Sequence, residues 1–213
     1  MDAFFIYREP FEEVCHCYSQ QEEPTRFGSL TELDGHKGFV IAPFASNTTH
    51  SIYLLDGKSG QSSVLPLDGS KGFEAIPNGQ DEAYLETSEV DPRIQYHNDF
   101  TCFHDELNRK SFRKLVLART IVEKKDEQMN PRDIFLKACE WYPRSYIALF
   151  YTAQTGMWLV ASPEILLRGN ATSYRTMALA GTMRYEGEEI QWSEKNREEQ
   201  QLVADYIRTC LQP

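Results

Sequence analysis

The chain has 213 residues, of which 41% are hydrophobic and 25% charged, and its formal net charge is −10. This composition is typical of a soluble globular protein with one or two domains. An acidic chain lacks the basic face that nucleic acids and anionic membranes require, so neither is expected as a partner. Without an apolar run of 18 residues or a secretory signal, the expected location is the cytoplasm.

The first 92 residues predict a β-rich region. Three apolar runs are typical of strands, at residues 3–8, 38–44 and 51–55. Residues 9–28 are polar and rich in Glu and Gln, which predicts a loop with one helical turn at most. The density of Gly, Pro, Asp and Ser predicts loops at 56–70 and 77–92. The five scattered cysteines are expected to be reduced, and Cys15-His16-Cys17 lacks the usual metal-ligand spacing, so it is expected to be structural.

From residue 93 the pattern changes to helices and grouped strands. Asp91-Pro92 and Asn130-Pro131 each place a capping side chain before a proline, which predicts helices over 93–110 and 130–142. Apolar spacing predicts a third helix over the last 20 residues. Strands are predicted at 114–123, 145–152, 157–162, 164–169 and 174–182, the last four of them antiparallel. We therefore expect an α+β fold of antiparallel sheets packed with helices, divided into regions 1–92 and 93–213.

Glu164 is a single carboxylate between the apolar runs 158–161 and 165–167. Burying an ionised carboxylate without a partner costs free energy. A carboxylate that ends a strand after Pro163 would simply point to water. In a partly desolvated position, by contrast, its pKa would rise, and it could hold a proton near neutral pH and donate it.

Lys114 and Glu199 are two further charged residues in unusual positions. Lys114 begins a predicted strand, where it is either solvated or a partly desolvated base. Glu199 lies four residues before Val203 on the apolar stripe of the last helix, although a charged run such as EKNREEQ is usually a solvated face. A carboxylate that faces inward requires a cation or a metal ion. An acid, a base and a metal ligand are the minimum for metal-assisted addition and elimination.

Four ordered motifs resemble the chorismate-utilising enzymes, a family that includes isochorismate, salicylate, anthranilate and aminodeoxychorismate synthases. The motifs are KLVLAR (114–119), SPEILLR (162–168), ALAGT (178–182) and EKNREEQQLV (194–203). The resemblance covers residues 93–212 and implies chorismate as the small-molecule substrate. It also implies that the chain holds the first part of the family's catalytic domain, because members run considerably further than Pro213.

The resemblance distinguishes between members of the family. Members that add water have Lys at the position of Lys114, where ammonia-using members typically have Gln. Aminodeoxychorismate synthases have Lys at the position of Ala180. The chain is therefore most similar to isochorismate synthase, an isomerase that feeds menaquinone or siderophore biosynthesis. Salicylate synthase is the alternative, and an anthranilate synthase-like enzyme is less consistent with Lys114.

The resemblance also implies roles for single residues. Lys114 would be the base that activates water for attack at ring carbon C2, and Glu164 the acid that protonates the departing C4 hydroxyl. Ala180, Gly181 and Thr182 would line the substrate pocket near the ring carboxylate. Glu199 would bind Mg²⁺ and so join an acidic site to an anionic substrate.

Two departures from the family pattern matter for activity. Members commonly have Glu-His where this chain has Glu199-Gln200, and they supply further magnesium carboxylates, a His and an Arg from their C-terminal half. All five histidines here lie at or before His104. We therefore expect an incomplete and inactive form of the enzyme. In a non-catalytic half-domain of this kind, the exposed apolar face of the 193–212 helix would favour self-association.

Overall fold

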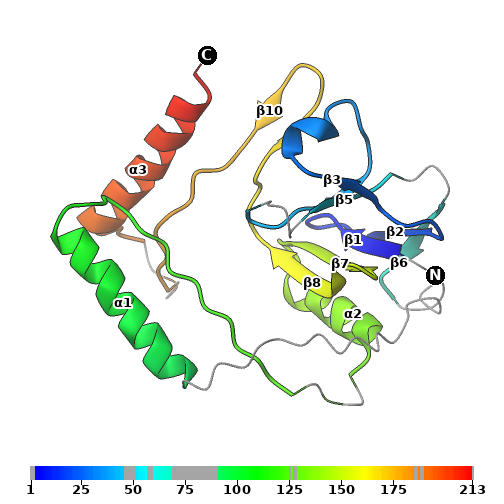
Figure 1. Ribbon diagram of the computed structural model, residues 1–213, viewed down its shortest axis with the longest axis horizontal. Coiled ribbons are helices and arrows are strands. Elements are labelled where there is room, and N and C mark those ends of the chain that lie inside the picture. Colours follow the sequence, from blue (N-terminus) through cyan, green and yellow to red (C-terminus); the bar gives the residue numbers. More distant parts are fainter. Residues whose placement is uncertain are drawn as a thin grey trace. The chain divides into compact units, whose positions relative to one another are not determined.

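The computed structural model describes residues 3–45, 51–56, 60–68, 91–124, 126, 129–184, 187 and 190–212. The chain forms two compact units, shown together in Figure 1. The first unit comprises Met1–Ala83 and Lys125–Pro163, and the second comprises Tyr84–Lys124 and Glu164–Pro213. The helices and antiparallel sheets confirm the α+β class predicted from the sequence.

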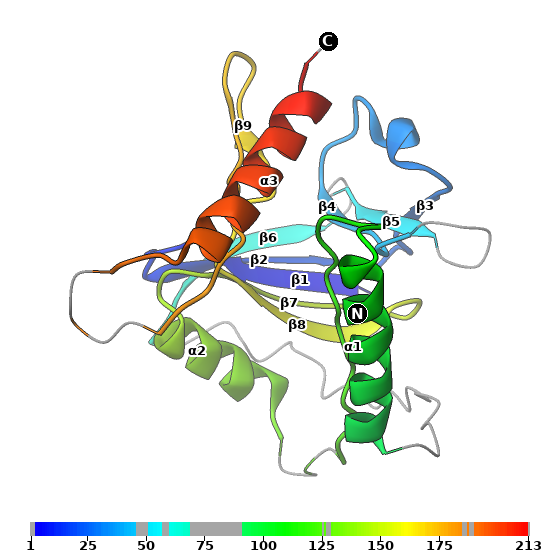
Figure 2. The same ribbon diagram turned by 90° about the vertical axis from the view of Figure 1, so that its left-hand side faces the viewer.

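A five-stranded antiparallel sheet is the centre of the first unit, with the strand order β6-β2-β1-β7-β8. Its strands are β1 (Ala3–Arg8), β2 (Val14–Gln20), β6 (Gln61–Pro66), β7 (Tyr146–Thr152) and β8 (Gly156–Ser162). Figure 2 shows the strands side by side in this order. The sheet thus takes strands from both sides of residue 92, and the division into regions 1–92 and 93–213 stays a prediction.

Helix α2 (Pro131–Trp141) covers one face of this sheet and forms the core with it. The helix begins as predicted, because the Asn130 side chain accepts a hydrogen bond from the Arg132 N–H at 2.9 Å. Alternate residues of the strands point towards α2. Each large apolar side chain buried there contributes about 1.5–3 kcal/mol. The core residues are Phe4, Ile6, Cys15, Phe135, Ala138, Cys139, Ile147 and Leu149.

A three-stranded antiparallel sheet also belongs to the first unit, with the order β3-β5-β4. Its strands are β3 (Thr25–Phe27), β4 (Phe39–Ile41) and β5 (Ile52–Leu55). The ring of Phe39 stacks on that of Phe5 with centroids 4.3 Å apart, which joins this sheet to the aromatic face of the larger one. Gly38 precedes Phe39 with a φ of 153°, and a Cβ there would collide with the Leu55 carbonyl, so the position requires glycine.

The second unit contains helices α1 (Pro92–Asn108) and α3 (Glu194–Cys210) and the short strands β9 (Arg168–Gly169) and β10 (Tyr174–Arg175). Both helices confirm the sequence prediction, and the Asp91 carboxylate caps α1 by accepting the Arg93 N–H at 2.8 Å. None of the described residues of this unit is buried. The described helices of the chain include none that is long and apolar enough to cross a membrane.

Two of the predicted loops contain strands. The loop predicted at 9–28 contains β2 and β3, and the one at 56–70 contains β6. The polar composition of these two segments suggested loops. A strand with one solvated face, however, needs only alternate apolar residues, and cysteine serves as one of them. Most of the loop predicted at 77–92 lies outside the described residues.

The strand predicted at 114–123 does not form, and those predicted at 164–169 and 174–182 shrink to β9 and β10. Within the described part of the chain, residues 114–124 have no paired strand. Apolar and β-branched residues favour a strand, but the strand forms only where a neighbour supplies hydrogen bonds.

Candidate functional site

The six residues singled out from the sequence all lie in the second unit. Lys114 follows α1, Glu164 and residues 180–182 lie before and after the β9–β10 hairpin, and Glu199 is on α3. The first unit holds none of them, so the candidate site is built on the hairpin, α3 and the segment after α1.

The β9–β10 hairpin places Glu164 close to the ALAGT motif. Beyond the paired strands, the Thr176 hydroxyl donates to the Leu166 carbonyl at 2.7 Å, and the Ile165 N–H lies 3.4 Å from the Met177 sulfur. Glu164 directly precedes Ile165, and ALAGT directly follows Met177. Glu164 therefore lies at the open end of the hairpin, where it is exposed.

The ALAGT motif packs against the first half of α3. The Gln200 side-chain amide donates to the Ala178 carbonyl. A Cβ on Gly181 would lie 3.0 Å from Cγ of Asn196, which is closer than ordinary van der Waals contact. Asn196 and Gln200 are four residues apart and share one face of the helix. Glycine at position 181 is therefore explained by close packing on α3, a reason that the sequence did not indicate.

Glu199 is half-buried on α3, with 32% of its side chain exposed, in line with the inward position expected from the helical pattern. Its partner is Lys195, whose Nζ lies 3.6 Å from Oε1 of Glu199. The sequence contained this signal, because a charge pair at four-residue spacing stabilises a helix. Of the three motif residues, Ala180 and Gly181 are half-buried and Thr182 is exposed.

Lys114 lies in the extended segment that follows α1. The Arg119 guanidinium carbon is 5.4 Å from the centre of the Tyr96 ring, so this segment runs back along α1. Lys114 is half-buried, and among the described residues no hydrogen bond or ion pair joins it to Glu164 or Glu199. The structure thus brings residues 180–182 to α3 and Glu164 to the same hairpin, but it does not bring Lys114 to them.

Glu199 is the carboxylate that the resemblance implies as the magnesium ligand. In the part of the chain that the structure describes, no group of three or more His, Cys, Asp and Glu side chains could hold a metal ion. Mg²⁺ is usually held by one or two carboxylates together with substrate oxygens and water. One carboxylate is the smallest such set of protein ligands, so Glu199 fits it once its ion pair with Lys195 opens.

A pocket of about 410 Å³ lies beside Gly181 in the second unit. The sequence indicated only Gly181 among its lining residues, and Asn196, Arg197 and Gln200 belong to a charged run that is typical of a solvated helix face. The signal was the shared helical face of Asn196 and Gln200. The lining residues are Leu179, Gly181, Trp192, Asn196, Arg197 and Gln200.

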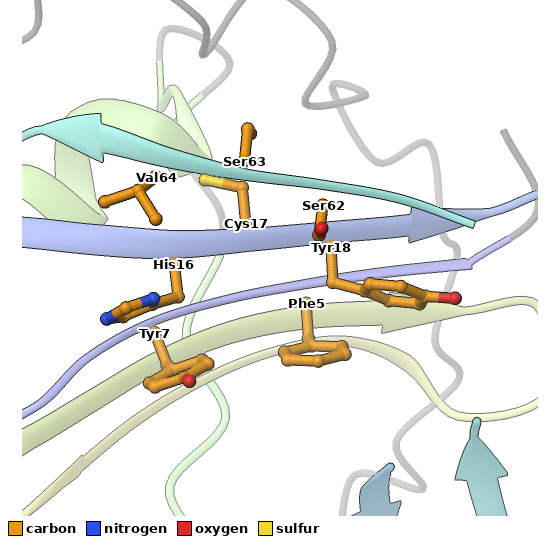
Figure 3. Close-up of a pocket in the computed structure, with 8 residues that line it drawn as sticks. All are labelled: Phe5, Tyr7, His16, Cys17, Tyr18, Ser62, Ser63 and Val64. Carbon is orange, nitrogen blue, oxygen red and sulfur yellow. The ribbon is translucent and has the colours of Figure 1, made fainter. Parts of the chain in front are cut away.

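The first unit has a pocket of about 370 Å³ on the sheet face opposite α2. Figure 3 shows the rings of Phe5, Tyr7, His16 and Tyr18 projecting from β1 and β2 on one side of the sheet. The Tyr7 and His16 rings stack with centroids 4.9 Å apart. His16 pairs with Glu12 at 3.3 Å, and Cys15, two residues from Cys17, packs in the core, so the Cys-His-Cys run serves packing.

Comparison with known proteins gives one family. A family model described as "Chorismate binding enzyme" matches residues 69–213, which is more than half of the chain and includes all four motifs. No curated protein and no solved structure matches the chain. The chain therefore belongs to the family of chorismate-binding enzymes.

Proposed function

We propose that the chain carries the chemistry of an isochorismate synthase, the Mg²⁺-dependent conversion of chorismate to isochorismate. Membership of the chorismate-binding family supports chorismate as the substrate. The observation that favours water as the nucleophile is the pair formed by Lys114 in KLVLAR and Ala180 in ALAGT. Ammonia-using and lysine-attacking members of the resembled family have other residues at these positions.

In the proposed reaction, Lys114 and Glu164 move one proton each. The Lys114 amine accepts a proton from water as the water oxygen bonds to ring carbon C2. The two ring double bonds shift, the C4–O bond breaks, and Glu164 donates a proton to the departing hydroxyl, which leaves as water. One water enters and one leaves, so the product is an isomer. Lys114 then returns a proton to Glu164 through solvent, which reaches the half-buried lysine and the exposed glutamate.

Glu199 would hold Mg²⁺, and the bound ion would supply positive charge against a substrate carboxylate. The Lys195–Glu199 pair must open for this, so Lys195→Gln is expected to tighten Mg²⁺ binding and Glu199→Gln to abolish it. Isothermal titration of Mg²⁺ without substrate measures both effects. Equal Mg²⁺ affinity for the parent chain and Glu199→Gln would exclude the assigned ligand.

We further propose that the 213-residue chain alone does not turn chorismate over. Catalysis needs the reacting groups held within a fraction of an ångström in a site that excludes water. Here Glu164 and Thr182 are exposed, Lys114 is not joined to Glu164, and none of the described residues of the second unit is buried. These observations support an incomplete site.

Chromatography of reaction products tests both proposals. The chain is incubated with chorismate and Mg²⁺, alongside protein expressed with any coding sequence that continues in frame after residue 213. We expect isochorismate only from the longer protein and none after Lys114→Ala. Turnover by the 213-residue chain that Lys114→Ala abolishes would overturn the proposal of an incomplete site. Release of pyruvate with salicylate would favour a salicylate synthase, and an ammonia-dependent product would favour an anthranilate synthase-like enzyme.

Self-association is a second candidate property, because α3 and the residue that caps it leave apolar side chains in solvent. Tyr206 and Leu211 are 71% and 69% exposed. Size-exclusion chromatography with light scattering is expected to show a dimer that Tyr206→Ser weakens and that Gln201→Ser, on the same helix, leaves unchanged. A monomer at every concentration would refute this candidate.

A further inference from the structure

Arg197 is a cation on α3 that forms no ion pair with another described residue. The other two cations of α3 both have carboxylate partners. Lys195 pairs with Glu199 at 3.6 Å, and Arg208 pairs with Asp205 at 2.9 Å. Among the described residues, no carboxylate pairs with the Arg197 side chain. Arg197 instead lines the pocket beside Gly181.

The lining of this pocket selects an anion with an apolar body. Of its six residues, Arg197 is the only charged one, so the lining carries one positive charge in a chain of net charge −10. Trp192 and Leu179 provide apolar surface, and the Asn196 amide adds hydrogen-bonding groups. A volume of about 410 Å³ lies within the usual range of about 300–1,000 Å³ for small-molecule sites.

The shape of the cationic group also matters. An arginine guanidinium is planar and donates two parallel N–H bonds to a carboxylate, whereas a lysine acts as a point charge. The dianionic substrate of the proposed function would be repelled by the overall charge of the chain, so it needs a local cation besides any metal ion. Arg197, which lies beside the ALAGT motif, would be this local cation.

We propose that this pocket binds a carboxylate of chorismate, with the Arg197 guanidinium on the carboxylate and the Trp192 and Leu179 side chains against the ring carbons. The identity of the ligand rests on the proposed function, whereas the class of ligand, a small ring carboxylate, rests on the pocket. Arg197 acts in binding and takes no part in proton transfer.

Isothermal titration of chorismate into the 213-residue chain tests this inference. The titration is carried out with EDTA, so that neither Mg²⁺ nor turnover contributes. Arg197→Gln is compared with Arg208→Gln, which makes the same charge change on the same helix outside the pocket. A hydrogen bond to a charged group predicts a Kd about 10- to 100-fold weaker for Arg197→Gln and unchanged for Arg208→Gln. Arg197→Lys is expected to recover part of the loss.

Two competitors and a second variant complete the design. Benzoate is expected to displace chorismate, and benzamide, which has nearly the same shape without the charge, is expected not to. Trp192→Leu should weaken both chorismate and benzoate, and far-UV circular dichroism checks that α3 persists in every variant.

The outcomes separate this inference from the proposed function. Binding that depends on Arg197, with no isochorismate formed by any form of the protein, would remove the proposed function and leave the carboxylate site. If isochorismate is formed but Arg197→Gln and Arg208→Gln bind chorismate equally well, the proposed function stands and this inference is overturned. Failure of chorismate to bind, or equal displacement by benzoate and benzamide, would also overturn it.

Discussion

Replacing Arg8 with methionine is expected to destabilise the first unit more than any surface change nearby. Arg8 ends β1, its side chain is 1% exposed, and it reaches the C-terminal end of α2. Nη1 donates to the Pro143 carbonyl at 2.6 Å, and Nη2 donates to the Tyr142 carbonyl at 2.7 Å and the Cys139 carbonyl at 3.4 Å. Cys139 lies in the last turn of α2, and Tyr142 and Pro143 directly follow the helix, so the guanidinium binds the C-terminal end of α2, where a cation is favoured by the helix dipole.

The magnitude follows from opposing contributions. Two short hydrogen bonds from a charged group contribute about 1.5–3 kcal/mol each, or about 3–6 kcal/mol together. Removing Arg8 also relieves the cost of a buried charge and of its Nε, which has no hydrogen-bond partner among the described residues. Relief of about 1–3 kcal/mol leaves a net loss of about 3 kcal/mol, a large part of the 5–15 kcal/mol typical of a domain.

Urea unfolding measures this loss. When Trp192 of the second unit is replaced by Phe, the two remaining tryptophans, Trp141 and Trp158, both lie in the first unit, so fluorescence reports on the unfolding of that unit. Arg144→Met is the matched control, because Arg144 is exposed close to the same carbonyls and its loss should change stability by about 0.5 kcal/mol or less. Arg8→Lys should fall between them. Equal unfolding free energies for Arg8→Met and Arg144→Met would refute the capping role.

Three further results are expected. Gly181→Ala should cost about 1–3 kcal/mol in the second unit by pushing Asn196 away. Asn196→Ala should restore part of this loss, because it removes the Cγ at 3.0 Å but keeps the Cβ at 3.1 Å, so additive losses in a double-mutant cycle would contradict the packing argument. Iodoacetamide should label exposed Cys102 in the native chain and spare buried Cys139, whose thiol pKa is raised mainly by burial. Peptide mass spectrometry measures the labelling, and faster labelling of Cys139 would contradict the burial argument. Burial, and secondarily the charges of neighbouring groups, raises the pKa of Tyr146. The contribution of Tyr146 to the unfolding free energy should therefore be full below pH about 10 and decline as the pH rises through the folded pKa. An equally large decline in Tyr146→Phe would contradict this.

The parts of the fold that the sequence predicted well are those with local signals. Asp91 and Asn130 accept the N–H two residues on, as the Asp-Pro and Asn-Pro pairs indicated, and both helices begin at the following proline. The segment 114–123 has an equally clear strand composition, but its state depends on a neighbour elsewhere in the chain. Local patterns carry no information about whether that neighbour is present.

The candidate site divides in the same way. The four motifs identified the family, and Glu199 has the half-buried position that its helical phase indicated. Arg197 and Asn196 were missed because a charged helical run is usually solvated, and only their place beside Gly181 gives them a role. Gly181 was predicted only to line the substrate pocket, whereas its close packing on Asn196 depends on a partner that the motif does not name.

The distribution of buried residues couples folding to binding in the second unit. The first unit has a packed core between α2 and its sheet, whereas none of the described residues of the second unit is buried. The ALAGT motif is held on α3 by the bond from Gln200 to Ala178 and by the packing of Gly181 on Asn196, and a hydrogen bond of this kind contributes only about 0.5–1.5 kcal/mol. A ligand at 100 times its Kd adds about 2.7 kcal/mol, which exceeds that contribution. A bound ligand or a packing partner would therefore be enough to fix the geometry of the site in the second unit.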